Sequence, residues 1–252
     1  MANDDPTVRL GPKSSDRQPV RRPRVLGSED VEAAAALLAR AFADDPSQVA
    51  LVPDETERLR IARLQALVRL RTATRHAAAY GVEQDGELAG VAVWNPPGVG
   101  VSAAAAIGAL IRALLVDSGR SFRTLRHIVP LLWQARATLR RFGSERSRAA
   151  REAQRGQVWY LALLGTDPGQ RGRGVARQLL DHVLERCDSE GLAAWTESTE
   201  ADNTAMYQRF GFDTVAHVPG SAPLPDLWVL RREPRLASGP RATAEPDGSG
   251  SG

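Results

Sequence analysis

The spacing of apolar residues predicts two helices in the first third of the chain. Apolar positions recur at helical intervals from Val31 to Phe42, and Ser28 precedes them as a candidate N-cap followed by acidic residues. Asp44-Asp45-Pro46 is expected to end this helix, because proline cannot continue one. A second helical pattern covers roughly residues 55–78.

Alternating and continuous apolar runs predict strands around these helices. Asp85-Gly86, the strongest short hairpin signal in the chain, separates the runs Tyr80–Gln84 and Leu88–Trp94. A longer strand, Val158–Thr166, leads through a glycine-rich turn into an amphipathic helix that Gly191 ends. The other expected elements are strands at 24–26, 192–198, 212–218 and 227–232 and a short helix at 203–209. The pattern favours an α/β chain.

One domain, residues 24–233, accounts for all of these elements. Within it, residues 101–153 again show helical periodicity and form a predicted helical insertion that could wall a substrate site. Its most apolar part, Val101–Val116, is shorter than the roughly 20 residues that a membrane helix needs. The ends, 1–23 and 234–252, are rich in Pro, Arg, Gly and Ser, and we expect them to be disordered tails.

Composition excludes several classes of function. The chain has 42% hydrophobic and 25% charged residues, a net charge of +3 and 5% aromatic residues, without the basic block or stacking platforms typical of a nucleic-acid binder. Cys187 is the only cysteine and lies on an apolar helical stripe, so an inert buried thiol is expected. The histidines are scattered, which predicts no metal site. The N-terminus lacks the apolar core of a signal peptide, which indicates a cytoplasmic protein.

The glycine-rich turn, residues 167–176, is the first candidate for chemistry. Glycines at alternate positions let successive backbone N–H groups converge, and the helix that follows adds the positive end of its dipole, so a pyrophosphate is favoured there. The turn lacks Gly-x-Gly-x-x-Gly and Gly-Lys-Ser/Thr, so a dinucleotide or nucleoside triphosphate is the weaker interpretation. By itself, the motif could also be a tight strand–helix joint.

The segment Arg171-x-x-Gly174-x-Ala176, after a strand and a proline, resembles the acyl-CoA signature of the GNAT superfamily of N-acetyltransferases. This resemblance implies the GNAT fold, a twisted, mostly antiparallel sheet of about seven strands flanked by helices, and acetyl-CoA as co-substrate without a metal. It also implies that backbone N–H groups hold the CoA pyrophosphate; these belong to Arg171, Gly172, Arg173, Gly174, Val175 and Ala176.

Two neighbouring features extend the resemblance. Asn203-x-x-x-Tyr207-x-x-x-Gly211-Phe212 is similar to the superfamily's later motif, in which the asparagine helps to hold the pantetheine arm and the tyrosine faces the CoA sulfur. The strand before the turn resembles the one whose splayed backbone, here near Leu164 and Thr166, pairs with the pantetheine amides.

A finer resemblance points to the puromycin N-acetyltransferase branch over most of residues 24–233. It rests on four segments: Ala41-Phe42-Ala43-Asp44-x-Pro46, Val91-Ala92-Val93-Trp94, Trp159-x-Leu161-Ala162 and Glu197-Ser198. It implies that Glu197 lies at the acceptor amine and that Tyr207 acts as an acid. The chain departs from that branch at Asp45, where the branch has tyrosine, and in a longer insertion before Val158.

The implied chemistry is acetyl transfer from acetyl-CoA to a primary amine of a small molecule. An ammonium with a pKa of about 8 to 10 must first lose a proton, and Glu197 is the candidate base, directly or through water, with Glu200 and Asp202 as close competitors. A backbone N–H near Leu164 would steady the oxyanion, and Tyr207 would protonate the departing thiolate.

Purely structural roles for these residues, and other functions for the chain, stay open. Tyr207 could be a core aromatic and Glu197 a solvated residue at a strand end. The chain could also be a non-catalytic acyl-CoA sensor, or could acetylate a protein amine, which would require an open groove.

Overall fold

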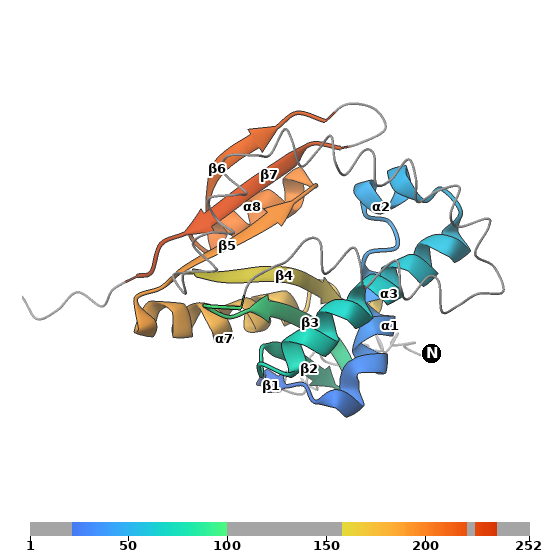
Figure 1. The fold of residues 1–252 in the computed structure, drawn as a ribbon, viewed down its shortest axis with the longest axis horizontal. Coiled ribbons are helices and arrows are strands. Elements are labelled where there is room, and N and C mark those ends of the chain that lie inside the picture. The colour runs from blue at the N-terminus through green and yellow to red at the C-terminus, as the bar shows by residue number, and fades with distance from the viewer. Residues whose placement is uncertain (1–21, 100–157, 221–224, 236–252) are drawn as a thin grey trace, which may run out of the picture.

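A seven-stranded sheet forms the centre of the computed structural model, which describes residues 22–99, 158–220 and 225–235. The strands are β1 (Arg24–Val25), β2 (Ala79–Gln84), β3 (Glu87–Asn95), β4 (Val158–Thr166), β5 (Ala193–Ser198), β6 (Asp213–Val218) and β7 (Leu227–Arg232). Their order is β1-β2-β3-β4-β5-β7-β6, and every neighbouring pair is antiparallel except β4 and β5 (Figure 1). The expected fold class is confirmed.

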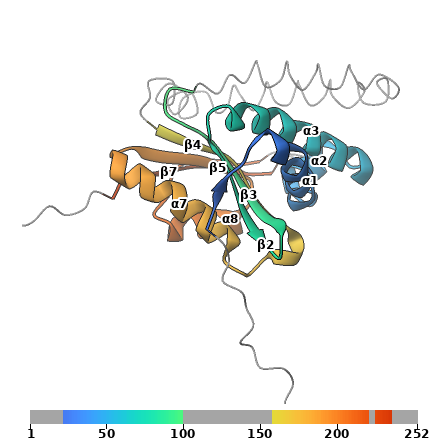
Figure 2. The same cartoon turned by 90° about the horizontal axis from the view of Figure 1, so that it is seen from below.

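Helices cover both faces of the sheet (Figure 2). They are α1 (Val31–Ala41), α2 (Pro46–Leu51), α3 (Glu55–Thr74), α7 (Val175–Glu190) and α8 (Ala201–Arg209). A Cβ added to Gly165 on β4 would lie 2.7 Å from Leu38 of α1, whereas one added to Gly90 on β3 would collide with Val175 of α7. Gly90 pairs with Thr166, the neighbour of Gly165, so these two glycines face opposite sides and α1 and α7 pack on opposite faces.

The core lies between these helices and the middle strands. Trp94 and Trp159 are buried and meet edge to face, with their ring centroids 6.3 Å apart. Cys187 is fully buried on the sheet-facing side of α7, and burial raises the pKa of its thiol to about 12. The expectation of a buried thiol is confirmed, and at neutral pH this thiol is protonated and therefore a poor nucleophile.

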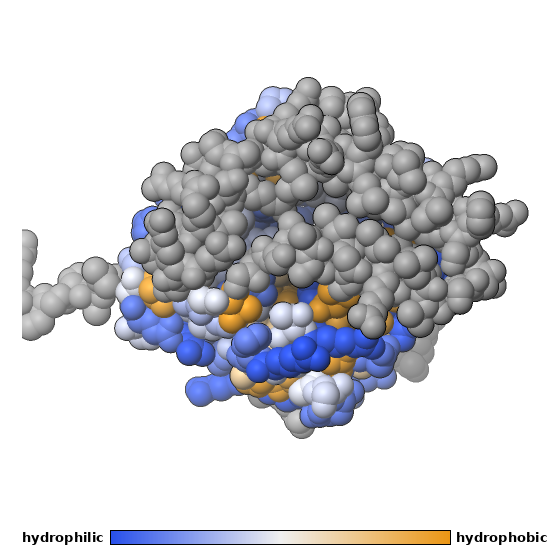
Figure 3. Space-filling model, viewed as in Figure 1, coloured by the Kyte–Doolittle hydropathy of each residue, from blue (hydrophilic) through white to orange (hydrophobic). Residues whose placement is uncertain are grey.

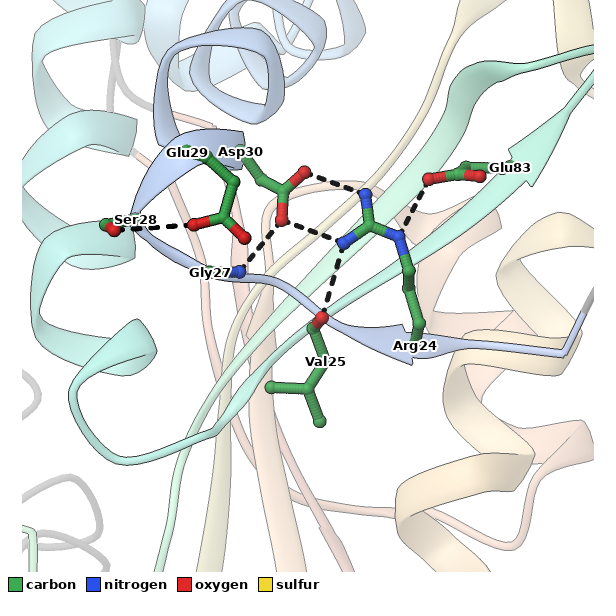
Figure 4. Close-up of polar contacts among 7 residues, drawn as sticks. All are labelled: Arg24, Val25, Gly27, Ser28, Glu29, Asp30 and Glu83. Atoms are coloured by element: carbon green, nitrogen blue, oxygen red, sulfur yellow. Dashed lines mark hydrogen bonds and ion pairs between the residues drawn. The ribbon is translucent and has the colours of Figure 1, made fainter.

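A cluster of charges anchors the start of the domain (Figure 4). The guanidinium of Arg24 on β1 pairs with both carboxylate oxygens of Asp30, at 2.7 and 2.8 Å, and with Glu83 of β2 at 2.7 Å. Asp30 also accepts from the N–H of Gly27, so a short 3₁₀ turn, Ser28–Asp30, precedes α1. The expected N-cap at Ser28 is therefore wrong, because α1 begins only at Val31.

Two helix boundaries also differ from the sequence-based expectation. Pro46 does not only follow the end of one helix: it is the first residue of α2, whose N-cap is Asp45. The second helix stops at Thr74 instead of residue 78, because Ala77 takes a left-handed conformation, φ +50°, and Ala78 already pairs with Trp94 in the sheet.

The surface of the described part is mixed in polarity (Figure 3). Among the described residues, three large hydrophobic side chains are exposed: Val25, Val49 and Val215. None of the described helices is long and apolar enough to cross a membrane. The predicted insertion, 101–153, and almost all of the two predicted tails lie outside the described residues.

Candidate active site

The candidate site begins where β4 and β5 separate. These parallel strands pair from Val158 and Ala193 up to Leu161 and Thr196, and no residue of β4 beyond Leu161 pairs with β5. The Thr196 hydroxyl donates to the Leu161 carbonyl, 3.1 Å away, at the last paired position. The rest of β4 therefore leaves one edge of its backbone open.

The alternating hydrogen-bond pattern between β4 and β3 shows which backbone groups of β4 face this opening. The Asp167 N–H donates to the Ala89 carbonyl at 2.9 Å, which makes these two residues a hydrogen-bonded pair on the β3 side. Hydrogen-bonded and non-bonded pairs alternate along antiparallel strands, so the polar backbone groups of Gly165 point to β3. Those of Leu164 and Thr166 consequently point away from β3, into the opening.

A cavity of about 580 Å³ occupies the opening. Its lining comes from β4, from the ends of α1, β5, β7 and α7, from α3 and α8, and from the loops beside them. The lining residues are Ala41, Phe42, Asp44, Asp45, Arg69, Tyr160, Leu161, Ala162, Leu163, Leu164, Gly165, Thr166, Gln170, Arg171, Gly172, Gly174, Val175, Ala176, Arg177, Thr196, Glu197, Ser198, Thr199, Glu200, Asn203, Met206, Tyr207 and Leu227.

The glycine-rich turn and the start of α7 line part of the cavity. Gly172 and Gly174 adopt left-handed conformations, with φ +74° and +79°, and a Cβ on either would have no atom within 4 Å. Gly174 is the N-cap of α7, whose first turn holds no acidic residue. The first N–H groups of a helix lack partners within it, so this end presents backbone donors and a positive dipole end to the cavity.

The loop that carries this end is tied to α1. Arg40 pairs with Asp167 at 2.8 Å, and Arg171 donates to the carbonyl of Ala41 at 3.2 Å. The Arg40 guanidinium, together with the N–H of Gly169, holds the pKa of the Asp167 carboxyl below its usual range. The glycine-rich loop and the C-terminal end of α1 thus form one wall of the cavity.

Tyr207 lies where β4 and β5 separate. It is 7% exposed, stacks edge to face on Phe212 with centroids 5.7 Å apart, and lines the cavity. Burial raises the pKa of its hydroxyl well above the ordinary value, although a side-chain hydrogen bond with Thr196 opposes the shift. The hydroxyl stays protonated at neutral pH and can act as a donor.

Carboxylates from β5 and the turn after it also line the cavity. Glu197, at the end of β5, is half-buried and lines it, as does Glu200, the N-cap of α8. Burial and the neighbouring carboxylate of Asp45 raise the pKa of Glu200, and its Oε2 accepts from the Asn203 side chain at 2.6 Å. The third candidate base, Asp202, is exposed and does not line the cavity.

The structure brings together ten of the eleven residues that the sequence analysis assigned to catalysis or CoA binding. Arg173 is exposed and lies outside the lining. Sequence reasoning missed Asp45, Arg69 and Met206, which also line the cavity. For Asp45 there was a signal, since Asp-Pro-Ser is a typical helix start, whereas Arg69 lies in the middle of α3 without any motif.

Known proteins share this fold and part of the sequence. Residues 131–212 match the model of the Acetyltransferase (GNAT) family. An uncharacterized N-acetyltransferase of Schizosaccharomyces pombe is 26% identical over 225 residues, covering 87% of this chain and 86% of the relative.

Solved structures resemble the whole domain. A Corynebacterium glutamicum structure described as histone acetyltransferase HPA2 and related acetyltransferase superposes with a TM-score of 0.55 at 22% identity, and arylalkylamine N-acetyltransferase 2 of Aedes aegypti with 0.52 at 16%. Each comparison covers 86% of this chain and 99% of the other. The family model matches part of the chain, and the solved structures show that the fold is shared over most of it.

Proposed function

We propose that this protein transfers the acetyl group of acetyl-CoA to a primary amine of a small molecule, by direct attack within a ternary complex. The observation that carries the proposal is the opening between β4 and β5. It has open backbone groups along β4, the N-terminal end of α7 with its unpaired backbone N–H groups, and Tyr207 and carboxylates in its lining. Its volume falls in the range of about 300 to 1,000 Å³ that is usual for small-ligand pockets.

In this proposal, the donor lies along β4. The N–H groups at the start of α7 and the loop cations bind the pyrophosphate, and the outward-pointing backbone of Leu164 and Thr166 pairs with the pantetheine amides. A ligand that pairs as an additional strand edge is held in one orientation, so the thioester carbon is presented at a fixed place beside Tyr207. Asn203 also lines the cavity, and its amide nitrogen donates to Glu200.

The amine reacts only as the free base. Glu197 takes its proton, directly or through water, and the nitrogen lone pair forms the bond to the thioester carbon. The carbonyl oxygen gains the negative charge, and a backbone N–H near Leu164 donates to it. Glu200 lies on the same side of the cavity and is the second candidate for the proton acceptor.

Collapse of the intermediate breaks the carbon–sulfur bond. Tyr207 donates its proton to the departing thiolate, which leaves CoA as a thiol and the amine as an amide. Because burial makes a lasting phenolate costly, the proton taken from the amine must restore the hydroxyl in the same turnover, with the amine's other released proton passing to solvent.

The acceptor is assigned to the small amines of the aminonucleoside or antibiotic kind. This assignment rests on the resemblance to the puromycin N-acetyltransferase branch that Glu197-Ser198 and Trp159-x-Leu161-Ala162 carry. Asp45, where that branch has tyrosine, lines the cavity, so puromycin itself is one member of the class to be tested and not the expected substrate.

Release of free thiol from acetyl-CoA, measured against a panel of amines, tests the proposal. The panel contains puromycin, polyamines and lysine peptides, and Glu197→Gln and Tyr207→Phe are assayed beside the wild type. We expect thiol release with one class of small amine, with kcat lowered about 100-fold in each variant, because general acid–base groups contribute roughly 10²- to 10⁴-fold.

Other outcomes would redirect the assignment. Turnover with lysine peptides alone would identify a protein acetyltransferase. Tight CoA binding without thiol release from any amine would contradict the enzymatic proposal and support an acyl-CoA sensor.

A further inference from the structure

Asp45 stands between α1 and α2, at the edge of the cavity, and its two carboxylate oxygens have different partners. Oδ1 accepts from the N–H of Ser47 at 2.9 Å, from the N–H of Gln48 at 3.2 Å and from the Ser47 hydroxyl. This oxygen caps α2 and fixes the carboxylate relative to that helix.

The second oxygen, Oδ2, accepts a hydrogen bond from a distant part of the chain. The hydroxyl of Thr199, a residue 154 positions away in the sequence, donates to Asp45 Oδ2 at 3.2 Å. Thr199 lies in the turn between β5 and α8, two residues after Glu197, and both partners line the cavity. This bond therefore joins the wall that follows α1 to the turn that carries the candidate base.

A buried arginine of α3 also holds the segment around Asp45 through hydrogen bonds. Arg58 of α3 is 7% exposed, and its guanidinium donates to the carbonyl of Ala43 at 2.7 Å and to those of Val52 and Pro53, each at 2.9 Å. The segment is thus clamped to α3 at both ends. The ends of this segment are fixed, so the Asp45–Thr199 bond holds the β5–α8 turn at a defined place relative to the segment.

The charge of Asp45 also reaches the acceptor end. Glu200, next to Thr199, is surrounded by Asp45, Arg171 and Asp202 and is hydrogen-bonded to Asn203. Of the charged groups around it, Asp45 is the one with the largest influence on its carboxyl. Loss of the Asp45 carboxylate would therefore change both the place and the electrostatics of this turn.

From these contacts we infer that Asp45 is a positioning residue for the acceptor: through Thr199 it holds the β5–α8 turn against the α1–α2 wall and so determines the affinity for the amine. The inference rests on the proposed function. It gives a role to the residue at which this chain departs from the puromycin N-acetyltransferase branch. It predicts a larger effect on the amine than on acetyl-CoA, because the loop before α7 is tied to α1 through other residues, Arg40 and Arg171.

Steady-state kinetics with the best amine of the panel test the inference. Thr199→Val removes the hydroxyl but keeps the Asp45 charge, and Asp45→Ala removes bond, charge and cap together. We expect each to raise KM for the amine about tenfold, the cost of losing one hydrogen bond to a charged group, while KM for acetyl-CoA stays within twofold. Thr199→Ser, which keeps the hydroxyl, should restore most of the lost affinity.

Asp54→Ala is the matched control. Asp54 caps α3 by accepting from the Glu57 N–H at 2.8 Å, so this variant also loses a helix cap, but Asp54 lies outside the cavity lining. If Asp54→Ala raises KM for the amine as much as Asp45→Ala does, the effect is one of general stability and the inference fails. If Asp45→Ala does not fold, the comparison of Thr199→Val with Thr199→Ser decides.

Failure of the inference differs from failure of the proposed function. An active wild type whose Thr199→Val variant keeps its amine KM, or raises both KM values equally, overturns the inference alone. A wild type that releases no thiol with any amine overturns both.

Discussion

Tyr207 is the residue whose environment makes the clearest kinetic prediction. A proton donor must be in its acid form, and burial moves the pKa of this hydroxyl above the phenol's ordinary value of about 10. A raised pKa extends the pH range in which the group stays protonated. We therefore expect kcat to stay level on the alkaline side up to at least about pH 9.5 once the base is deprotonated.

A pH–rate profile at saturating amine measures this. The profile of Tyr207→Phe should have the same shape at a lower rate, because the alkaline limb of the wild type is not set by Tyr207 in that range. A falling limb between about pH 8 and 9 that disappears in Tyr207→Phe would show that the hydroxyl titrates at an ordinary or lowered pKa, contrary to its burial.

Individual site residues could be predicted from sequence only where a motif fixes the spacing. Tyr207 and Asn203 follow from one helical motif, and Gly174 from another. Arg69 belongs to the cavity only because the tertiary fold brings α3 to its lining, and no local pattern encodes that. Asp45 had a local signal as a helix cap, but its contact with Thr199, far away in the sequence, depends on the tertiary fold.

At the scale of elements, the joint between β4 and α7 is the proposed donor site. Gly174 adopts φ +79° beside open space, so a glutamate there places a negative charge at the helix end that is proposed to bind the pyrophosphate. We expect Gly174→Glu to lower CoA affinity by at least 100-fold in calorimetric titration, because it adds repulsion, bulk and backbone strain of about 1 to 2 kcal/mol at this site.

Gly86→Glu is the control for backbone strain. Gly86 has φ +85° in the β2–β3 turn, and a Cβ on it would likewise have no atom within 4 Å, but it does not line the cavity. Both variants should lose similar stability, whereas CoA binding should survive in Gly86→Glu. Unchanged CoA affinity in a folded Gly174→Glu would refute the assignment of the pyrophosphate site.

Element types were more predictable than their arrangement. The span Val158–Thr166 agrees with β4 because its apolar run is bounded by a clear turn, and the Asp85-Gly86 hairpin follows from turn chemistry. Local patterns also indicate that the last two strands form a hairpin. They do not encode that β7 lies between β5 and β6, because this order results from long-range pairing with β5.

At the scale of the whole molecule, one ion pair joins the last strand, β7, to α7, the helix that follows the proposed donor site. Arg232 of β7 is 3% exposed in its side chain, and it contacts both oxygens of Asp188 on α7, at 2.7 and 2.8 Å. It also donates to the carbonyl of Phe210, at the end of α8, at 3.0 Å. Three elements that flank the opening are therefore fastened at a single buried guanidinium.

Breaking this pair should destabilise the fold in a pH-dependent way. The Arg232 guanidinium lowers the pKa of the Asp188 carboxyl. The ionised Asp188 therefore contributes its full stabilisation above the unfolded-state pKa of about 3.9, and this stabilisation is lost as the pH falls through the lower folded-state pKa. We expect Asp188→Asn to lower the free energy of unfolding by about 2 to 3 kcal/mol at pH 7, because it leaves a buried cation without its counter-charge.

Urea denaturation at pH 7 and at about pH 2.5 measures the difference. In acid the wild-type carboxyl is itself becoming protonated, so the gap between wild type and Asp188→Asn should shrink. Asp181→Asn serves as the control, since the Arg177–Asp181 pair is solvent-exposed with atoms 3.7 Å apart and should contribute at most about 0.5 kcal/mol. A gap that is equally large at both pH values would mean that Asp188 stabilises the fold through its hydrogen bonds and not through its charge.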